Sequence, residues 1–155
     1  MNPFVLDPRS RLSAWKELRT QIQAVEFLDD KVQLTLTFWK QAPIENPILD
    51  WDNSSRWPTP WELLNNNRFC ESTLSLAVAM TLVMSEPSLF EDIELLLITD
   101  RRHHVQKVVA RLPECVLNYG WLDIHPRDIL QGCSLHRLWT YDGRQWAETQ
   151  PNQNN

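Results

Sequence analysis

Three residues in the middle of the chain have the types and the order that thiol chemistry needs. Cys70 precedes a long apolar run, His104 opens a strand-like run, and Asn118 ends the next one. A thiol at a helix N-terminus becomes a nucleophile when an imidazole takes its proton, and an amide oxygen can orient that imidazole. We therefore predict an acyl-transfer site with Cys70 as nucleophile, His104 as general base and acid, and Asn118 as orienting group.

Each of the three residues also has an alternative interpretation. Cys70 can be a small buried side chain, as most cysteines are. His104 can be a solvated turn residue, and because His103 precedes it, a shift of one residue in the strand register exchanges the two histidines. Asn118 precedes a Tyr-Gly pair, where an asparagine commonly forms a turn.

An acyl-transfer site also needs donors for the developing oxyanion. No glutamine lies between Gln41 and Cys70 to supply a side-chain donor. The candidates that remain are the side chains of Trp61 and Asn67 and the backbone N–H of Cys70. The N–H groups at the start of a helix are unpaired, so the backbone donor is the natural one.

The elements that carry these residues are indicated by the apolar pattern. Residues 70–84 predict a helix that is apolar nearly all round, as is typical of a helix with neighbours on several sides. This helix is too short, and too polar at its start, to span a membrane. Residues 93–99, 104–110 and 115–119 predict three strands, joined by turns short enough for an antiparallel meander.

The N-terminal region predicts a helix followed by a hairpin. Residues 7–24 have apolar positions three or four residues apart, with Asp7 as a good N-cap and Pro8 at the first helical position. Residues 25–28 and 32–38 are expected to form two strands, because the second of these segments alternates between apolar and polar side chains.

The rest of the chain predicts loops and short elements. Residues 41–58 contain several prolines and asparagines and are expected to be irregular, pinned by their own tryptophans. Thr59 and Glu62 form a capping-box pattern that opens a short helix, and the asparagines at 65–67 end it. Residues 138–146 predict a second hairpin, turned at an Asp-Gly pair.

Composition and charge exclude several classes of protein. The chain of 155 residues is 43% hydrophobic and 23% charged, which fits one soluble domain. Its net charge of −5 argues against nucleic-acid binding, which needs a basic face. We expect a single domain over residues 1–146, a disordered tail over 147–155, no membrane partner, and a cytoplasmic location or, for a phage protein, the virion.

The cysteines and histidines provide enough ligand types for a zinc site. None has the spacing of a known zinc motif, and the cysteine count is odd, so we expect free thiols and neither a metal nor a cofactor. The residues considered are Cys70, His103, His104, Cys115, His125, Cys133 and His136.

Four segments follow one another in the order of a known family: the run Arg68–Thr73, the run Glu94–Asp100, His104, and the run Val116–Asn118. Together with the apolar helix after Cys70, they resemble the core of transglutaminase-like cysteine peptidases, in particular their small bacterial and phage branch. The resemblance covers about residues 60–122. It implies an α+β fold of papain/transglutaminase-like architecture, in which a central buried helix packs on an antiparallel sheet. It also implies a protein or peptide substrate.

A second hypothesis keeps this fold without its chemistry. The family most often has an aspartate where this chain has Asn118, and glycines that this chain lacks around Cys70. Eight tryptophans, several of them in the proline-rich segment 41–61, suit contact surfaces with partner subunits. The chain would then be a structural or interaction protein assembled into a larger particle, such as a head–tail or neck component of a phage virion.

Overall fold

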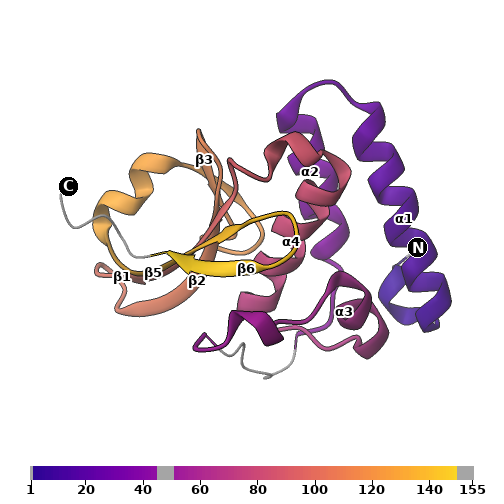
Figure 1. The fold of residues 1–155 in the computed structure, drawn as a ribbon, viewed down its shortest axis with the longest axis horizontal. Coiled ribbons are helices and arrows are strands. Elements are labelled where there is room, and N and C mark those ends of the chain that lie inside the picture. Colours follow the sequence, from indigo (N-terminus) through magenta and orange to yellow (C-terminus); the bar gives the residue numbers. More distant parts are fainter. Residues whose placement is uncertain (1, 45–50, 150–155) are drawn as a thin grey trace.

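The computed structural model describes residues 2–44 and 51–149, and these residues form an α+β fold. The helices gather on one side of a six-stranded antiparallel sheet with the strand order β4-β3-β2-β1-β5-β6 (Figure 1). The predicted combination of helices with an antiparallel sheet is confirmed.

Helices α1 (Pro8–Ala24) and α3 (Pro60–Asn66) begin where the capping residues predict. Proline occupies the first helical position of both, and in α3 the capping box between Thr59 and Glu62 is complete. Asn67 ends α3 in the left-handed conformation, with φ of 54°, which asparagine tolerates better than most residues. In α3 the capping box satisfies backbone N–H groups within one turn, whereas in α1 Pro8 has no N–H that would need a partner.

The N-terminal hairpin predicted for residues 25–38 is wrong. Leu28–Trp39 form the helix α2, which packs against α1. Val32, Leu36 and Trp39 are buried at helical spacing, and Val32 and Leu36 also satisfy the alternating pattern of a strand. Burial of Trp39 against the core decides between the two periods.

The polar residues of the same segment also suit a helix. Asp29 and Asp30 lie in the first turn of α2, where a negative charge is stabilised by the helix dipole. The ammonium group of Lys31 donates to the carbonyl oxygens of Ile22 (2.9 Å) and Val25 (2.7 Å) at the end of α1. The two helices are thereby joined at their connection.

Helix α4 (Glu71–Ser85) is the central buried helix that the sequence predicts. It lies between the other helices and the sheet, in contact with α1, α2 and β2 (Figure 1). The hydroxyl of Thr81 accepts the indole N–H of both Trp15 and Trp39, each at 3.0 Å. One buried side chain of α4 therefore satisfies the polar groups of two buried tryptophans on separate helices.

The sheet contains the three predicted strands and extends beyond them. β1 (Glu94–Asp100), β2 (Val105–Arg111) and β3 (Cys115–Leu117) form the expected meander, and β4 (Ile124–Pro126) adds to its edge. β5 (Cys133–Tyr141) and β6 (Trp146–Thr149) form the expected C-terminal hairpin on the other side of β1.

Ordered structure reaches beyond the predicted domain end at residue 146. Residues 147–149 belong to β6, because Leu138 and Trp139 pair with Thr149 and Glu148. That part of the predicted disordered tail is therefore wrong, and residues 150–155 lie outside the described residues.

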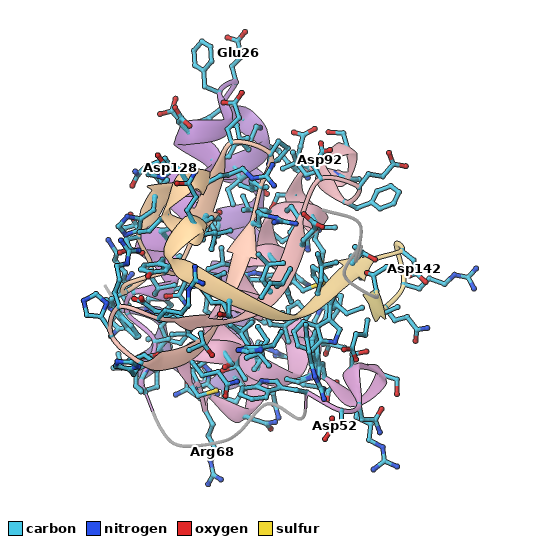
Figure 2. The ribbon with its side chains drawn as sticks, turned by 90° about the vertical axis from the view of Figure 1, so that its left-hand side faces the viewer. Glu26, Asp52, Arg68, Asp92, Asp128 and Asp142 are labelled. Carbon is cyan, nitrogen blue, oxygen red and sulfur yellow. The ribbon has the colours of Figure 1, made fainter. Side chains whose placement is uncertain are left out.

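Both faces of the sheet are covered. Leu95, Leu97 and Val108 pack with the helices in the main core, whereas Leu96 and Ile98 belong to a second apolar cluster on the opposite face. The second cluster is covered by the 3₁₀ segment η4 (Arg127–Gly132), whose Asp128 is labelled in Figure 2. Burial on both faces explains why β1 is a nearly continuous apolar run.

The described part of the proline-rich segment is pinned by tryptophans, as predicted. Trp57 is buried and packs edge-on against Trp139, with 5.0 Å between ring centroids. The guanidinium of Arg137 donates to the carbonyl oxygen of Trp51 at 2.8 Å. Residues 45–50 of this segment lie outside the described residues.

Candidate functional site

Cys70 lies at the start of α4, as predicted, and is the N-cap residue of that helix. Its Sγ accepts the backbone N–H of Thr73 at 3.5 Å, and its own N–H donates to the Thr73 hydroxyl at 2.8 Å. The half-buried thiol therefore faces the positive end of a helix, which is where a nucleophilic cysteine is favoured.

The expected oxyanion donors are largely engaged elsewhere. The backbone N–H of Cys70 is used within its own capping box, as described above. The amide nitrogen of Asn67 donates to the carbonyl oxygen of Phe4 at 3.1 Å. Trp61 packs edge-on against Trp15, with 5.8 Å between ring centroids.

Asn118 lies next to the cysteine helix, but its amide is used as a structural clamp. It follows β3 in the left-handed conformation, with φ of 65°, and only 3% of it is exposed. Its Nδ2 donates to the carbonyl oxygen of Glu71 (3.1 Å) and to the hydroxyl of Ser75 (2.8 Å). Its Oδ1, the atom expected to orient an imidazole, accepts the backbone N–H of Leu122 at 2.8 Å.

His104 lies in the turn between β1 and β2 rather than in β2, which begins at Val105. It is exposed and has a φ of 56°, so the strand alternation that would aim it at Cys70 does not apply to it. Within residues 2–44 and 51–149, no hydrogen bond joins His104 to Cys70 or Asn118. The predicted strand placement of His104 is wrong because a left-handed residue ends the extended backbone.

His103, unlike His104, hydrogen-bonds a buried carboxylate, and this carboxylate lies on the sheet face that is turned away from α4. Its Nδ1 hydrogen-bonds the carboxylate of Asp100 at 2.7 Å. Asp100 is two residues beyond Ile98 on β1 and so shares the sheet face that is turned away from α4. The structure therefore brings Asn118 close to the cysteine helix, and within the described residues no hydrogen bond joins either histidine to Cys70 or to Asn118.

The buried carboxylate of Asp100 is the centre of a polar cluster that sequence reasoning missed. Only 1% of this residue is exposed. It accepts hydrogen bonds from the Tyr119 hydroxyl (2.6 Å), the Arg102 backbone N–H (2.9 Å) and His103. Lys107 lies with its ammonium 4.6 Å from the centre of the Tyr119 ring. The available signal was an aspartate that ends the most apolar strand of the chain.

Hydrogen bonding and burial shift the pKa values of two groups in opposite directions. The hydrogen bonds from Tyr119, and then from His103, hold the pKa of Asp100 well below its ordinary value. Burial, together with the hydrogen bond to Asp100, raises the pKa of Tyr119 well above its ordinary value. The folded protein therefore favours a charged carboxylate next to a neutral phenol.

This pair predicts loss of stability at both ends of the pH range. Asp100 stabilises the fold above its ordinary pKa of 3.8, and this contribution is lost as the pH falls below that value. Tyr119 stabilises the fold below its ordinary pKa of 10.0, and this contribution is lost as the pH rises above that value. Tyr119→Phe should flatten both limbs of a plot of unfolding free energy against pH, measured by urea denaturation. Limbs as steep as those of the unsubstituted protein would contradict the assignment.

No protein-family model matches this chain, and no curated protein matches it. In the described part of the chain, no helix is long and apolar enough to cross a membrane, and no group of three His, Cys, Asp or Glu side chains is placed to hold a metal ion. The three cysteines form no disulfide.

The proline-rich segment lines a cavity beside α4, against Leu76, Met80 and Met84 of that helix. This cavity has a volume of about 220 Å³, and its walls include Trp57, Trp61, Met80 and Met84. Met80 and Met84 belong to the C-terminal half of α4, whereas Cys70 precedes the first turn and is not part of the lining. The cavity that this segment walls therefore does not include the thiol.

Proposed function

We propose that this chain acts by binding other proteins, as a component of a larger assembly, and that it does so on a papain/transglutaminase-like framework that carries no acyl-transfer relay. The observation that carries the proposal is the state of the Asn118 amide. All of its hydrogen bonds are made to Glu71, Ser75 and Leu122, and none is made to an imidazole. A relay of cysteine, histidine and asparagine needs that oxygen to fix the histidine tautomer.

Two further features support a binding role. His104 lies in an exposed turn, where no hydrogen bond within residues 2–44 and 51–149 joins it to Cys70 or Asn118 for proton transfer. The aromatic side chains of Phe27 and Trp61 are exposed, and aromatic residues are enriched in protein interfaces.

Thiol acyl transfer is the second candidate, and the position of Cys70 is what favours it. An N-cap thiol facing the first-turn N–H groups of a buried helix is placed as the nucleophiles of cysteine peptidases are. In this alternative, His104 would have to act after a rearrangement of the turn between β1 and β2.

Alkylation of the three cysteines by iodoacetamide separates the two candidates. The rate at each cysteine is followed by mass spectrometry between about pH 5 and pH 9 in the unsubstituted protein and in His104→Ala. We expect the rate at Cys70 to be the same in both proteins within about twofold, because His104 makes no contact that would activate the thiol.

The controls use the same proteins. His103→Ala is the matched variant, since it removes the neighbouring imidazole, and Cys133 provides an internal reference rate. If Cys70 reacts rapidly below pH 7 and slows about tenfold or more in His104→Ala alone, the chain is a thiol enzyme and the binding proposal is wrong.

A further inference from the structure

Helices α1 and α2 leave an open groove along their length. Its volume is about 690 Å³, and its apolar floor is formed by Leu6, Ala14, Leu18, Val25, Leu34 and Phe38. Trp15 and Trp39, whose indole N–H groups donate to Thr81 of α4, do not belong to the lining. The groove therefore lies on a side of the helix pair other than the one that faces α4. Glu26, labelled in Figure 2, projects from the connection of the two helices at one end of the groove.

The groove has the spacing of an unfilled helix bundle. Its lining includes positions 14, 18 and 21 of α1 with position 25 just beyond it, and positions 30, 34 and 37 of α2 with position 41 just beyond it. Both sets repeat at four, three and four residues, which is the spacing of the seam between packed helices. Small side chains at Ala14 and Thr37 leave room for larger ones from a third helix. From Ala14 to the end of α1 the seam is about 15 Å long at 1.5 Å per residue, which suits a helix rather than a small molecule.

The charges of the groove indicate which helix would fit. The lining contains the carboxylates of Glu17 and Asp30 and, among the described residues, no lysine or arginine. A second copy of the chain would place these carboxylates against their own equivalents, which is unfavourable. A helix with basic residues beside its apolar stripe would pair with them.

Exposed apolar side chains lie close in sequence to lining residues at both ends of α1. Val5 is 76% exposed and precedes the lining residue Leu6, whereas Phe27 is 65% exposed and follows the lining residue Val25 by two positions. They are the most exposed of the large apolar side chains in the described residues. A partner helix longer than the groove would cover both.

We propose that α1 and α2 bind an amphipathic basic helix of another protein and so complete a three-helix bundle. This inference rests on the proposed binding role, but the groove that it concerns does not include Cys70. The alkylation experiment can therefore contradict the proposed function while the peptide titration still shows helix binding. The titration can likewise show no binding while the alkylation result stands.

The test is titration of the full chain with a fluorescein-labelled synthetic peptide of about 18 residues, with leucine at the a and d positions and lysine at most of the others. We expect binding with a dissociation constant in the micromolar range that weakens as salt is added. Two control peptides accompany it. One has the same composition in a scrambled order, and the other has glutamate in place of lysine. Neither should bind measurably.

Variants of the chain locate the binding surface. Glu17→Lys should weaken binding about fivefold or more at low salt, whereas Glu91→Lys, the same change at an exposed position outside the groove, should alter it less than about twofold. Ala14→Trp, which fills the groove without changing charge, should weaken binding about tenfold or more. Circular dichroism confirms that each variant is folded.

Several outcomes would overturn the proposal. It is wrong if the scrambled or glutamate peptide binds as tightly as the basic amphipathic one, if no peptide binds, or if Glu17→Lys and Glu91→Lys behave alike. It is also wrong if sedimentation shows that the chain dimerises and that Ala14→Trp abolishes the dimer, because the occupant of the groove would then be a second copy.

Discussion

Thr81→Val is expected to lower the free energy of unfolding by about 3 kcal/mol, the largest effect of a single near-isosteric change in this core. Valine keeps the shape of threonine but cannot accept hydrogen bonds. The indole N–H groups of Trp15 and Trp39, both fully buried, would lose their shared acceptor. Each buried donor left unpaired costs about 1–3 kcal/mol. Urea denaturation followed by tryptophan fluorescence measures the loss.

Thr81→Ser provides the matched control. Serine retains the hydroxyl and removes only a methyl group, so a loss of about 1 kcal/mol is expected. A double-mutant cycle with Trp15→Phe tests the mechanism, because the valine substitution should cost less once one of the two indoles is gone. Equal losses for serine and valine would show that packing, rather than the shared acceptor, is what Thr81 contributes.

Asn118→Ala is expected to destabilise the fold by a similar amount, about 3 kcal/mol. It removes a buried amide that joins β3 to α4 and leaves the N–H of Leu122 without an acceptor. It also places an alanine in the left-handed conformation, at a cost of about 1 kcal/mol that Asn118→Gly should avoid. The difference in unfolding free energy between the two variants therefore separates the backbone contribution from that of the amide.

Asn118→Asp distinguishes a structural clamp from a catalytic group. Aspartate has no N–H to donate to Glu71 or Ser75 and brings a charge into a buried position, so we expect the unfolding free energy to fall. A catalytic role predicts a different result, because a carboxylate orients an imidazole better than an amide does. If Asn118→Asp is as stable as the parent and makes Cys70 alkylation depend on His104, the clamp interpretation is wrong.

Elements whose signals lie within one or two turns of the chain were predicted well. The capping box at Thr59, the proline at the start of α1 and the all-round apolar pattern of α4 each determine a structure locally. The failure at α2 has a definite cause. Val32 and Leu36 fit a strand and a helix equally, and only the packing of Trp39 against Phe4 and Phe69 shows which period is used.

The candidate site depended on contacts that no local pattern contains. The sequence places Cys70 at a helix start and Asn118 after a strand, and the structure has both there. The side-chain partners were not predictable, because the Asn118 amide is satisfied by α4 and by the turn that follows it. The direction of the histidines depends on a single left-handed residue at His104, which moves the strand start by one position.

Patterns in the sequence therefore indicated the class of fold, the central helix and the meander of β1, β2 and β3, because capping, turns and apolar spacing involve residues that are near one another in the chain. Which polar groups meet depends on packing between elements that are distant in the chain. This packing pairs His103 with Asp100 on the sheet face that is turned away from α4. It also places the Asn118 side chain in hydrogen-bond contact with α4 and leaves a groove between α1 and α2. The physical reason is that a buried polar group takes whichever partner the packing brings within about 3 Å, and that partner is set by the whole fold.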